Sequence, residues 1–264
     1  MKQRIITGIL IIISVLPPLF YGGIPLRILI FAICAVASYE IVHLRSKTTD
    51  WPLTIFTFIS ILAMYNVDNY YYVPMLSIYV IVLFAIMITS NSFDIDSLSY
   101  MLLISLILTI ACKGAVNIQE LGTLSVLYIA IACYGTDAFA YFTGVKFGKH
   151  KMIPRISPNK TWEGAIGGYV AGLILSLIFG LSLLNFEALP SHLIIFLSIT
   201  LPIIAQLGDL SFSAIKRHYK LKDFGTIFPG HGGVLDRIDS LLFCIIYTYA
   251  VLIIYLGPAN TFLF

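Results

Sequence analysis

The feature that most constrains the fold of this chain is its amount of uninterrupted apolar sequence. Hydrophobic residues make up 59% of the 264 residues and charged residues only 11%, with a mean hydropathy of +0.96. A membrane-spanning helix needs about 20 mostly apolar residues. We place candidate spans at residues 5–21, 27–43, 52–66, 72–90, 98–113, 121–145, 164–184, 191–208 and 237–257, of which the third and fifth are short. An ordinary soluble domain is excluded, and we expect an all-α, polytopic bundle of about nine transmembrane helices.

The distribution of basic residues predicts the orientation of this bundle. With the N-terminus in the cytoplasm and nine alternating spans, the outside segments hold only Arg27 and Lys113, and the other 14 lysines and arginines are inside. Cytoplasmic loops are enriched in Lys and Arg, so this asymmetry predicts a cytoplasmic N-terminus. The four cysteines lie within apolar stretches and lack metal-ligand spacing, so we interpret them as buried packing residues. Glu40 and His43, near the end of the second span, are interpreted as a cap or a lipid contact.

A first polar segment covers residues 134–164. Asp137 lies inside the sixth span, where a carboxylate near mid-membrane costs about 2.5–3.5 kcal/mol on insertion scales. Helical spacing places Asp137, Tyr141 and Gly144 along one face. We interpret this face as part of a polar cavity; the alternative is an aspartate that only joins helices. The candidate phosphate ligands Ser157, Lys160 and Thr161 follow in a basic loop and precede the next helix, whose N-terminal amides suit an anion.

A second polar segment runs from Gln206 to Asp239. Residues 213–239 alone hold five basic residues, three aspartates, two histidines and four glycines. Helical spacing would place Asp209, Ser213, Lys216 and Lys220 on one face, beside Arg217. A loop with His231, Gly232 and Gly233 follows, and then Asp236, Arg237 and Asp239 open the last span. Cations for phosphates, carboxylates for a metal and glycines for close backbone approach predict a phosphate site. The blander interpretations are a solvated helix at 204–220 and acids that complement a helix dipole.

Both segments resemble the phosphatidate cytidylyltransferases, also called CDP-diacylglycerol synthases. The family pattern in the second segment matches Ser213, Lys216, Arg217, Lys222, Asp223, Gly225, Phe228, Pro229, His231, Gly232, Gly233, Asp236, Arg237 and Asp239. In the first segment it matches Gly135, Asp137, Ala140, Tyr141, Gly144, Phe147, Gly148, Lys149, Ser157, Pro158, Lys160, Thr161, Glu163 and Gly164. Asn159 stands where some members carry a basic residue, which argues against a phosphate role at that position.

The resemblance implies transfer of a cytidylyl group from CTP to phosphatidate, giving CDP-diacylglycerol and pyrophosphate. Magnesium typically takes one or two carboxylates plus substrate phosphates, so Asp209 and Asp236, with Ser213, are the expected ligands. Asp137 and Asp239 are candidates for a second cation or for supporting contacts. Lys160, Lys216, Arg217 and Arg237 are expected to hold phosphate charge. Ser157, Thr161 and the His231–Gly233 loop are the remaining expected substrate contacts.

This reading implies a single transmembrane domain over residues 1–264. Residues 1–130 carry no assignable motif, and residues 131–257 are expected to hold the catalytic helices and cytoplasmic loops. The expected partners are CTP and membrane phosphatidate, with no nucleic acid; a homodimer is left open. We expect a bacterial inner membrane, with the active site facing the cytoplasm. The alternatives are a CTP-dependent enzyme with another lipid acceptor, such as a CDP-archaeol synthase or a polyprenol or phytol kinase, and a transporter.

Overall fold

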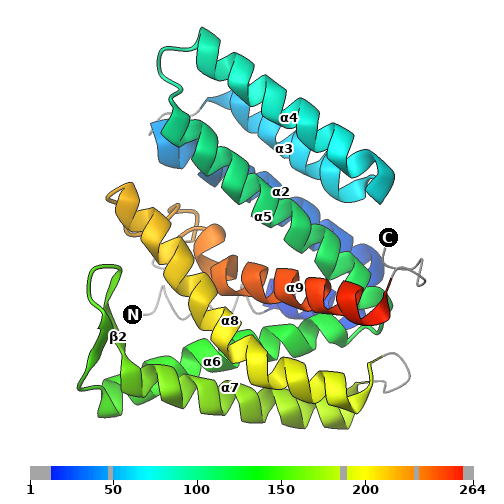
Figure 1. Ribbon diagram of the computed structural model, residues 1–264, viewed down its shortest axis with the longest axis vertical. Helices are drawn as coiled ribbons and strands as arrows, with labels where there is room; N and C mark the ends of the chain where they lie inside the picture. Colours follow the sequence, from blue (N-terminus) through cyan, green and yellow to red (C-terminus); the bar gives the residue numbers. More distant parts are fainter. Residues whose placement is uncertain (1–12, 47–49, 185–188, 229–231, 258–264) are drawn as a thin grey trace.

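The computed structural model describes residues 13–46, 50–184, 189–228 and 232–257, and these residues form a helical bundle with one small hairpin (Figure 1). The elements are α2 (Gly23–Ser46), α3 (Trp51–Asn66), α4 (Asn69–Thr89), α5 (Ile95–Glu120), α6 (Ser125–Phe147), β1 (Lys151–Ile153), β2 (Ser157–Thr161), α7 (Trp162–Leu183), α8 (Ser191–His218) and α9 (Leu235–Leu256). Residues 13–21 are also helical, and the rest of the predicted first span lies outside the described residues.

Seven of the described helices are long and apolar enough to cross a membrane, namely α2 and α4 to α9. The shorter apolar helix α3 has 16 residues. The prediction of an all-α polytopic membrane protein is therefore confirmed. The prediction that the fifth span is short was wrong, because α5 has 26 residues. Asp94 caps the helix by accepting a hydrogen bond from the backbone N–H of Ser97 (2.9 Å), so α5 begins at Ile95, and at its other end it continues past residue 113 to Glu120.

The helices follow one another across the bundle in Figure 1, from the α6–α7 pair through α8 and α9 to α2 and α5, with α3 and α4 beyond them. The α6–α7 pair is held close by glycines on one face of α7. A Cβ atom on Gly168 would lie 2.5 Å from the backbone oxygen of Thr136, and one on Gly164 would lie 2.7 Å from that of Ala140. Small residues let membrane helices approach closely, and this contact sets the position of the polar residues of α6.

Loops that the charge pattern assigns to one side of the membrane are joined in the structure. Lys113 donates to the backbone oxygen of Val67 (3.0 Å), and both belong to segments predicted to lie outside. The hydroxyl of Tyr219 donates to the backbone oxygen of Asp96 (3.3 Å), and both belong to segments predicted to lie inside. The relative sidedness of these loops therefore agrees with the alternation of spans, while the cytoplasmic assignment stays a prediction.

The basic loop between α6 and α7 folds into an antiparallel hairpin of β1 and β2 that the sequence did not predict. Two contacts hold it at the end of the bundle. The Glu163 carboxylate accepts hydrogen bonds from the backbone N–H of Lys149 (3.1 Å) and from the imidazole Nδ1 of His150 (2.6 Å). Arg217 of α8 donates through Nε to the backbone oxygen of Ile156 (3.1 Å). The hairpin therefore brings β2 against the end of α8.

Candidate active site

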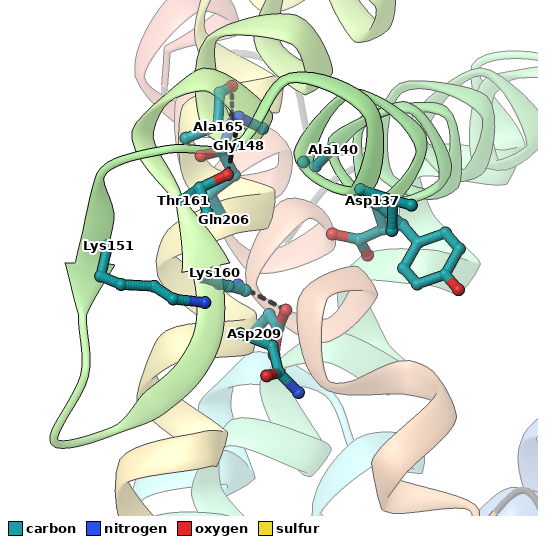
Figure 2. Close-up of a pocket in the computed structure, with 14 residues that line it drawn as sticks. Asp137, Ala140, Gly148, Lys151, Lys160, Thr161, Ala165, Gln206 and Asp209 are labelled. Atoms are coloured by element: carbon teal, nitrogen blue, oxygen red, sulfur yellow. Dashed lines mark hydrogen bonds and ion pairs between the residues drawn. The ribbon is translucent and has the colours of Figure 1, made fainter.

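A cavity of about 530 Å³ lies where α6, α7, α8 and the hairpin meet (Figure 2). Its lining combines charged and polar side chains with small residues: Asp137, Ala140, Tyr141, Gly144, Val145, Gly148, Lys151, Asn159, Lys160, Thr161, Gly164, Ala165, Gln206 and Asp209. The predicted face of Asp137, Tyr141 and Gly144 therefore does line a polar cavity. Figure 2 shows Asp137 pointing from α6 into this space.

The hairpin and α8 meet inside the cavity through an ion pair. Lys160 Nζ of β2 lies 2.5 Å from Asp209 Oδ2 of α8, and both side chains are about a quarter exposed. Ser213, one turn along α8, donates to the other carboxylate oxygen of Asp209 (3.2 Å), as the i, i+4 spacing predicted. Thr161 caps α7, because its Oγ1 accepts the backbone N–H of Gly164 (3.2 Å). These contacts place a cation, a carboxylate and hydroxyls around one solvent-accessible space.

A second ion pair lies deeper, between α8 and the start of α9. Lys216 Nζ donates to Asp236 Oδ1 at 2.7 Å. The other oxygen of Asp236 accepts the backbone N–H groups of Phe224 (2.7 Å) and Gly233 (2.9 Å). Asp236 thus fastens both ends of the loop between α8 and α9, and in this conformation its oxygens are engaged by protein donors.

Two further carboxylates lie near these pairs. Asp239 of α9 is close enough to Asp209, Lys216 and Asp137 to interact with their charges, and Asp137 interacts with Asp209 and Lys160. Among the described residues, neither Asp137 nor Asp239 has an ion-pair partner. Asp239 is buried and Asp137 is half-buried. Carboxylates removed from water without a cation are costly, so this donor set suits a divalent cation.

The carboxylates of the site would have to move closer together to bind one metal ion. Within the described part of the chain, no three His, Cys, Asp or Glu side chains already form a metal-binding group. Magnesium commonly keeps waters and completes its shell with substrate phosphates. The oxygen donors of Asp209, Asp236, Asp137 and Asp239 therefore fit Mg²⁺ chemically, and the magnesium site stays a prediction.

The glycine loop of the second polar segment is only partly described. His231 lies outside the described residues. Gly232 has φ +85°, which an L-residue rarely adopts, and a Cβ on it would lie 2.9 Å from Asp236 Oδ2. The N–H of Gly233 is used by Asp236. These two glycines therefore bring the backbone close to Asp236, and a phosphate role for them stays a prediction.

The remaining predicted residues lie at the edge of the site. Arg217 bonds to the backbone oxygens of Ile156 and Leu221 and so braces the hairpin. Ser157 lies at the far end of β2 and does not line the cavity. The side chain of Arg237 is exposed at the start of α9. Lys220, at φ +57°, follows the end of α8 and leaves the predicted helix face.

Two features of the site were missed. An apolar groove of about 330 Å³ between α7 and α8 adjoins the cavity and shares Ala165 and Gln206 with it. Glu40 of α2 reaches the start of α9 and accepts the backbone N–H groups of Val234 and Leu235. The sequence left Glu40 open as a cap or a lipid contact, and the structure shows that it caps α9.

This fold and site define a polytopic membrane protein with a charged cavity of about 530 Å³ at one end of its helices. The chain belongs to the Cytidylyltransferase family, whose family model matches residues 2–255. It is similar to the phosphatidate cytidylyltransferase of Bacillus subtilis (strain 168), with 36% identity over an alignment 273 residues long, which covers 97% of this chain and 98% of that protein. It is also similar to the phosphatidate cytidylyltransferase of Staphylococcus aureus (strain COL), with 34% identity over 252 residues that cover 92% and 95%.

Proposed function

We propose that this protein transfers a cytidylyl group from CTP to phosphatidate, giving CDP-diacylglycerol and pyrophosphate for phospholipid synthesis. The observation that carries this proposal is the charged cavity at the end of the α6–α7–α8 bundle, in a chain that belongs to the Cytidylyltransferase family over nearly its whole length. A CTP-dependent enzyme with another acceptor is less well supported, because the similar proteins are named for phosphatidate.

The chemistry requires little proton transfer. An oxygen of the phosphatidate phosphomonoester attacks the α-phosphorus of CTP, a new P–O bond forms, and the bond to the β-phosphate oxygen breaks to release pyrophosphate. The second pKa of a phosphomonoester is about 6, so the nucleophile is already largely dianionic at neutral pH. Repulsion between two anions is the main obstacle, and positioning with charge stabilisation should dominate catalysis.

The lysines of the site meet this requirement. Lys160 extends from β2 into the cavity and pairs with Asp209, so an arriving phosphate can compete for its ammonium group. Lys216 lies deeper beside Asp236, where low solvent exposure strengthens its charge interactions. We assign Lys160 to the nucleotide phosphates and Lys216 to charge that develops during transfer. Arg237, exposed at the start of α9, is assigned to the leaving pyrophosphate.

The acids are assigned to the metal. Asp209 and Asp236 would hold Mg²⁺, with Ser213 beside Asp209 and with Asp137 and Asp239 close by for a second cation. When bound, Mg²⁺ neutralises phosphate charge and orients the triphosphate. Lys160 and Ser213 hold the Asp209 carboxylate at the cavity, and Lys216 holds that of Asp236 at the start of α9.

The acyl chains of phosphatidate fit the apolar groove beside the cavity. Its lining comes from α7 and α8 together with Met152, and it includes Trp162, Ile166, Tyr169, Ile203 and Leu207. The shared residues Ala165 and Gln206 join this groove to the polar cavity. A lipid whose chains occupy the groove would have its headgroup at the Lys160–Asp209 pair. We place this end of the bundle at the cytoplasmic face of a bacterial inner membrane, where CTP is available.

Purified protein in lipid or detergent, with labelled CTP and phosphatidate, tests the proposal. We expect Mg²⁺-dependent formation of labelled CDP-diacylglycerol and release of pyrophosphate. Release of CDP with phosphorylation of a polyprenol would identify a kinase instead. Turnover with an ether-linked archaeal acceptor but not with phosphatidate would identify the other alternative. Absence of turnover with any acceptor, in folded protein with Mg²⁺ or Mn²⁺, would overturn the assignment.

A further inference from the structure

Glu40 lies in the N-terminal half of the chain, which carries no motif, yet it contacts the catalytic half directly. Its residue exposure is 0%, and it extends from α2 toward the start of α9. Its two carboxylate oxygens accept the backbone N–H groups of Val234 (2.7 Å) and Leu235 (2.9 Å), which are 194 and 195 residues away in the sequence. A buried carboxylate with two such bonds has a defined structural task.

That task is to cap α9. The N-cap residue of this helix, Val234, has no side chain that can accept a hydrogen bond, although the first amides of any helix lack intrahelical partners. Glu40 supplies the acceptor from another helix, and its negative charge is favourable at the positive end of the α9 dipole. Asp236 accepts the neighbouring N–H of Gly233. The backbone N–H groups of three consecutive residues, 233 to 235, are therefore all bonded to carboxylates, one to Asp236 and two to Glu40.

Two glycines of this region, Gly225 and Gly233, leave the space that the Glu40 carboxylate occupies. A Cβ on Gly225 would lie 2.7 Å from Glu40 Oε1, and a Cβ on Gly233 would collide with the same carboxylate. Both glycines belong to the segment 213–239 that the sequence pattern singled out. Their lack of a side chain lets the Glu40 carboxylate pass between the loop and α9. The loop, its glycines and Glu40 thus form one packed unit.

We propose that Glu40 is a positioning residue for cytidylyl transfer. By fixing the first amides of α9, it sets where Asp236 lies and how that carboxylate faces Lys216, 2.7 Å away. Glu40 itself lines neither the cavity nor the groove. Its removal should therefore lower turnover without weakening nucleotide binding. This inference rests on the proposed function of the same site.

The test compares Glu40→Gln with Glu120→Gln, a matched change at an exposed residue at the end of α5. Glu40→Gln keeps the shape but loses the charge and one of two acceptor oxygens. We expect kcat per folded molecule to fall about ten- to a hundredfold, the effect of losing one charge-assisted hydrogen bond, while KM for CTP stays nearly constant. The Glu120→Gln variant should match wild type in both constants.

A second pair of variants keeps the test decisive if a single change impairs folding. Gly225→Ala should lower kcat in the same way, because its methyl group would push against Glu40. In a Glu40→Ala background that methyl has room, so Gly225→Ala should add little further loss. If Gly225→Ala lowered kcat by the same factor in the wild-type and Glu40→Ala backgrounds, the inference would be overturned. So would a Glu40→Gln variant with wild-type kcat, or one whose activity falls only in proportion to folded protein. An inactive wild type would instead overturn the proposed function.

Discussion

Lys216 of α8 and Asp236 of α9 form an ion pair at 2.7 Å in which the side chains are only 9% and 3% exposed. The pair is central because each partner makes further contacts. Asp236 also holds the loop amides of Phe224 and Gly233, and Lys216 lies over the Phe224 ring, 5.4 Å from its centroid. The Lys216–Asp236 pair therefore connects α8, the loop and α9 in one arrangement.

Breaking this pair from one side should destabilise the protein strongly. Lys216→Met leaves the Asp236 carboxylate buried without a cation, and removing one partner of a buried pair typically costs about 3–5 kcal/mol. Asp236→Asn should cost a similar amount, because it leaves the Lys216 ammonium group buried without an anion. The double variant should regain part of the stability lost in Lys216→Met but none of the activity. Thermal unfolding in detergent and CTP turnover measure the two effects; a double variant whose stability losses simply add would contradict a coupled pair.

The proposed shared metal predicts non-additive losses of activity. Asp209→Asn and Asp236→Asn each remove a charge at nearly constant shape. If both side chains bind one Mg²⁺, each change should abolish most turnover and the double variant should lose little more, as residues that act as a unit do. Binding of Mn²⁺, followed by paramagnetic resonance, should weaken in the same variants.

The control for this pair is Asp223→Asn. Asp223 is exposed in the loop and makes no ion pair with the described residues, so Asp223→Asn should lower activity clearly less. A larger defect at Asp223 than at Asp209 in folded protein would show that the metal is assigned to the wrong carboxylate. Cleanly multiplicative losses from mild single variants would argue against a shared cation.

Much of this site follows from sequence spacing on helices. The i, i+4 relation of Asp209 and Ser213 is a hydrogen bond in the structure, and Asp137 does point into the cavity. Such contacts lie within one helix or depend on helical periodicity alone, which the sequence carries directly. The membrane class followed as simply, from the length of the apolar runs.

Contacts between distant segments could not be predicted in the same way. Glu40 bonds to backbone amides 194 residues away, and a backbone amide has no sequence pattern that names its partner. The hairpin is too short and too charged to show strand alternation, and it forms because Glu163 and Arg217 hold its ends. Helix α8 extends beyond its apolar run to His218, because Asp209 and Lys216 are in ion pairs and Arg217 bonds to the hairpin.

Lys160 provides a test of nucleotide binding. Lys160→Met removes the ammonium group that lies in the cavity beside Asp209 while keeping a side chain of similar length. We expect KM for CTP to rise about tenfold, which corresponds to about 1.4 kcal/mol of lost interaction. Lys146→Met, at an exposed position at the end of α6, is the matched control and should leave KM unchanged. An equal rise in both variants would mean that only the overall positive charge of this surface matters.

The groove between α7 and α8 predicts a defect that is specific to the lipid substrate. Ile203 lines the groove and is 55% exposed, so a larger side chain there can fill the groove without entering the core. Ile203→Trp should raise the apparent KM for long-chain phosphatidate and leave KM for CTP near its wild-type value. Ile178→Trp, on an exposed position of α7 that does not line the groove, is the matched control.

The length of the acyl chains separates this effect from a general disturbance of α8. A phosphatidate with very short chains needs little of the groove, so Ile203→Trp should turn it over at nearly the wild-type rate. Each methylene buried in an apolar site contributes about 0.8 kcal/mol, so the defect should grow with chain length until the groove is filled. A defect of the same size for short and long chains would mean that the acyl chains bind elsewhere. The tryptophan would then act by displacing Gln206 and Asp209, which follow Ile203 on α8.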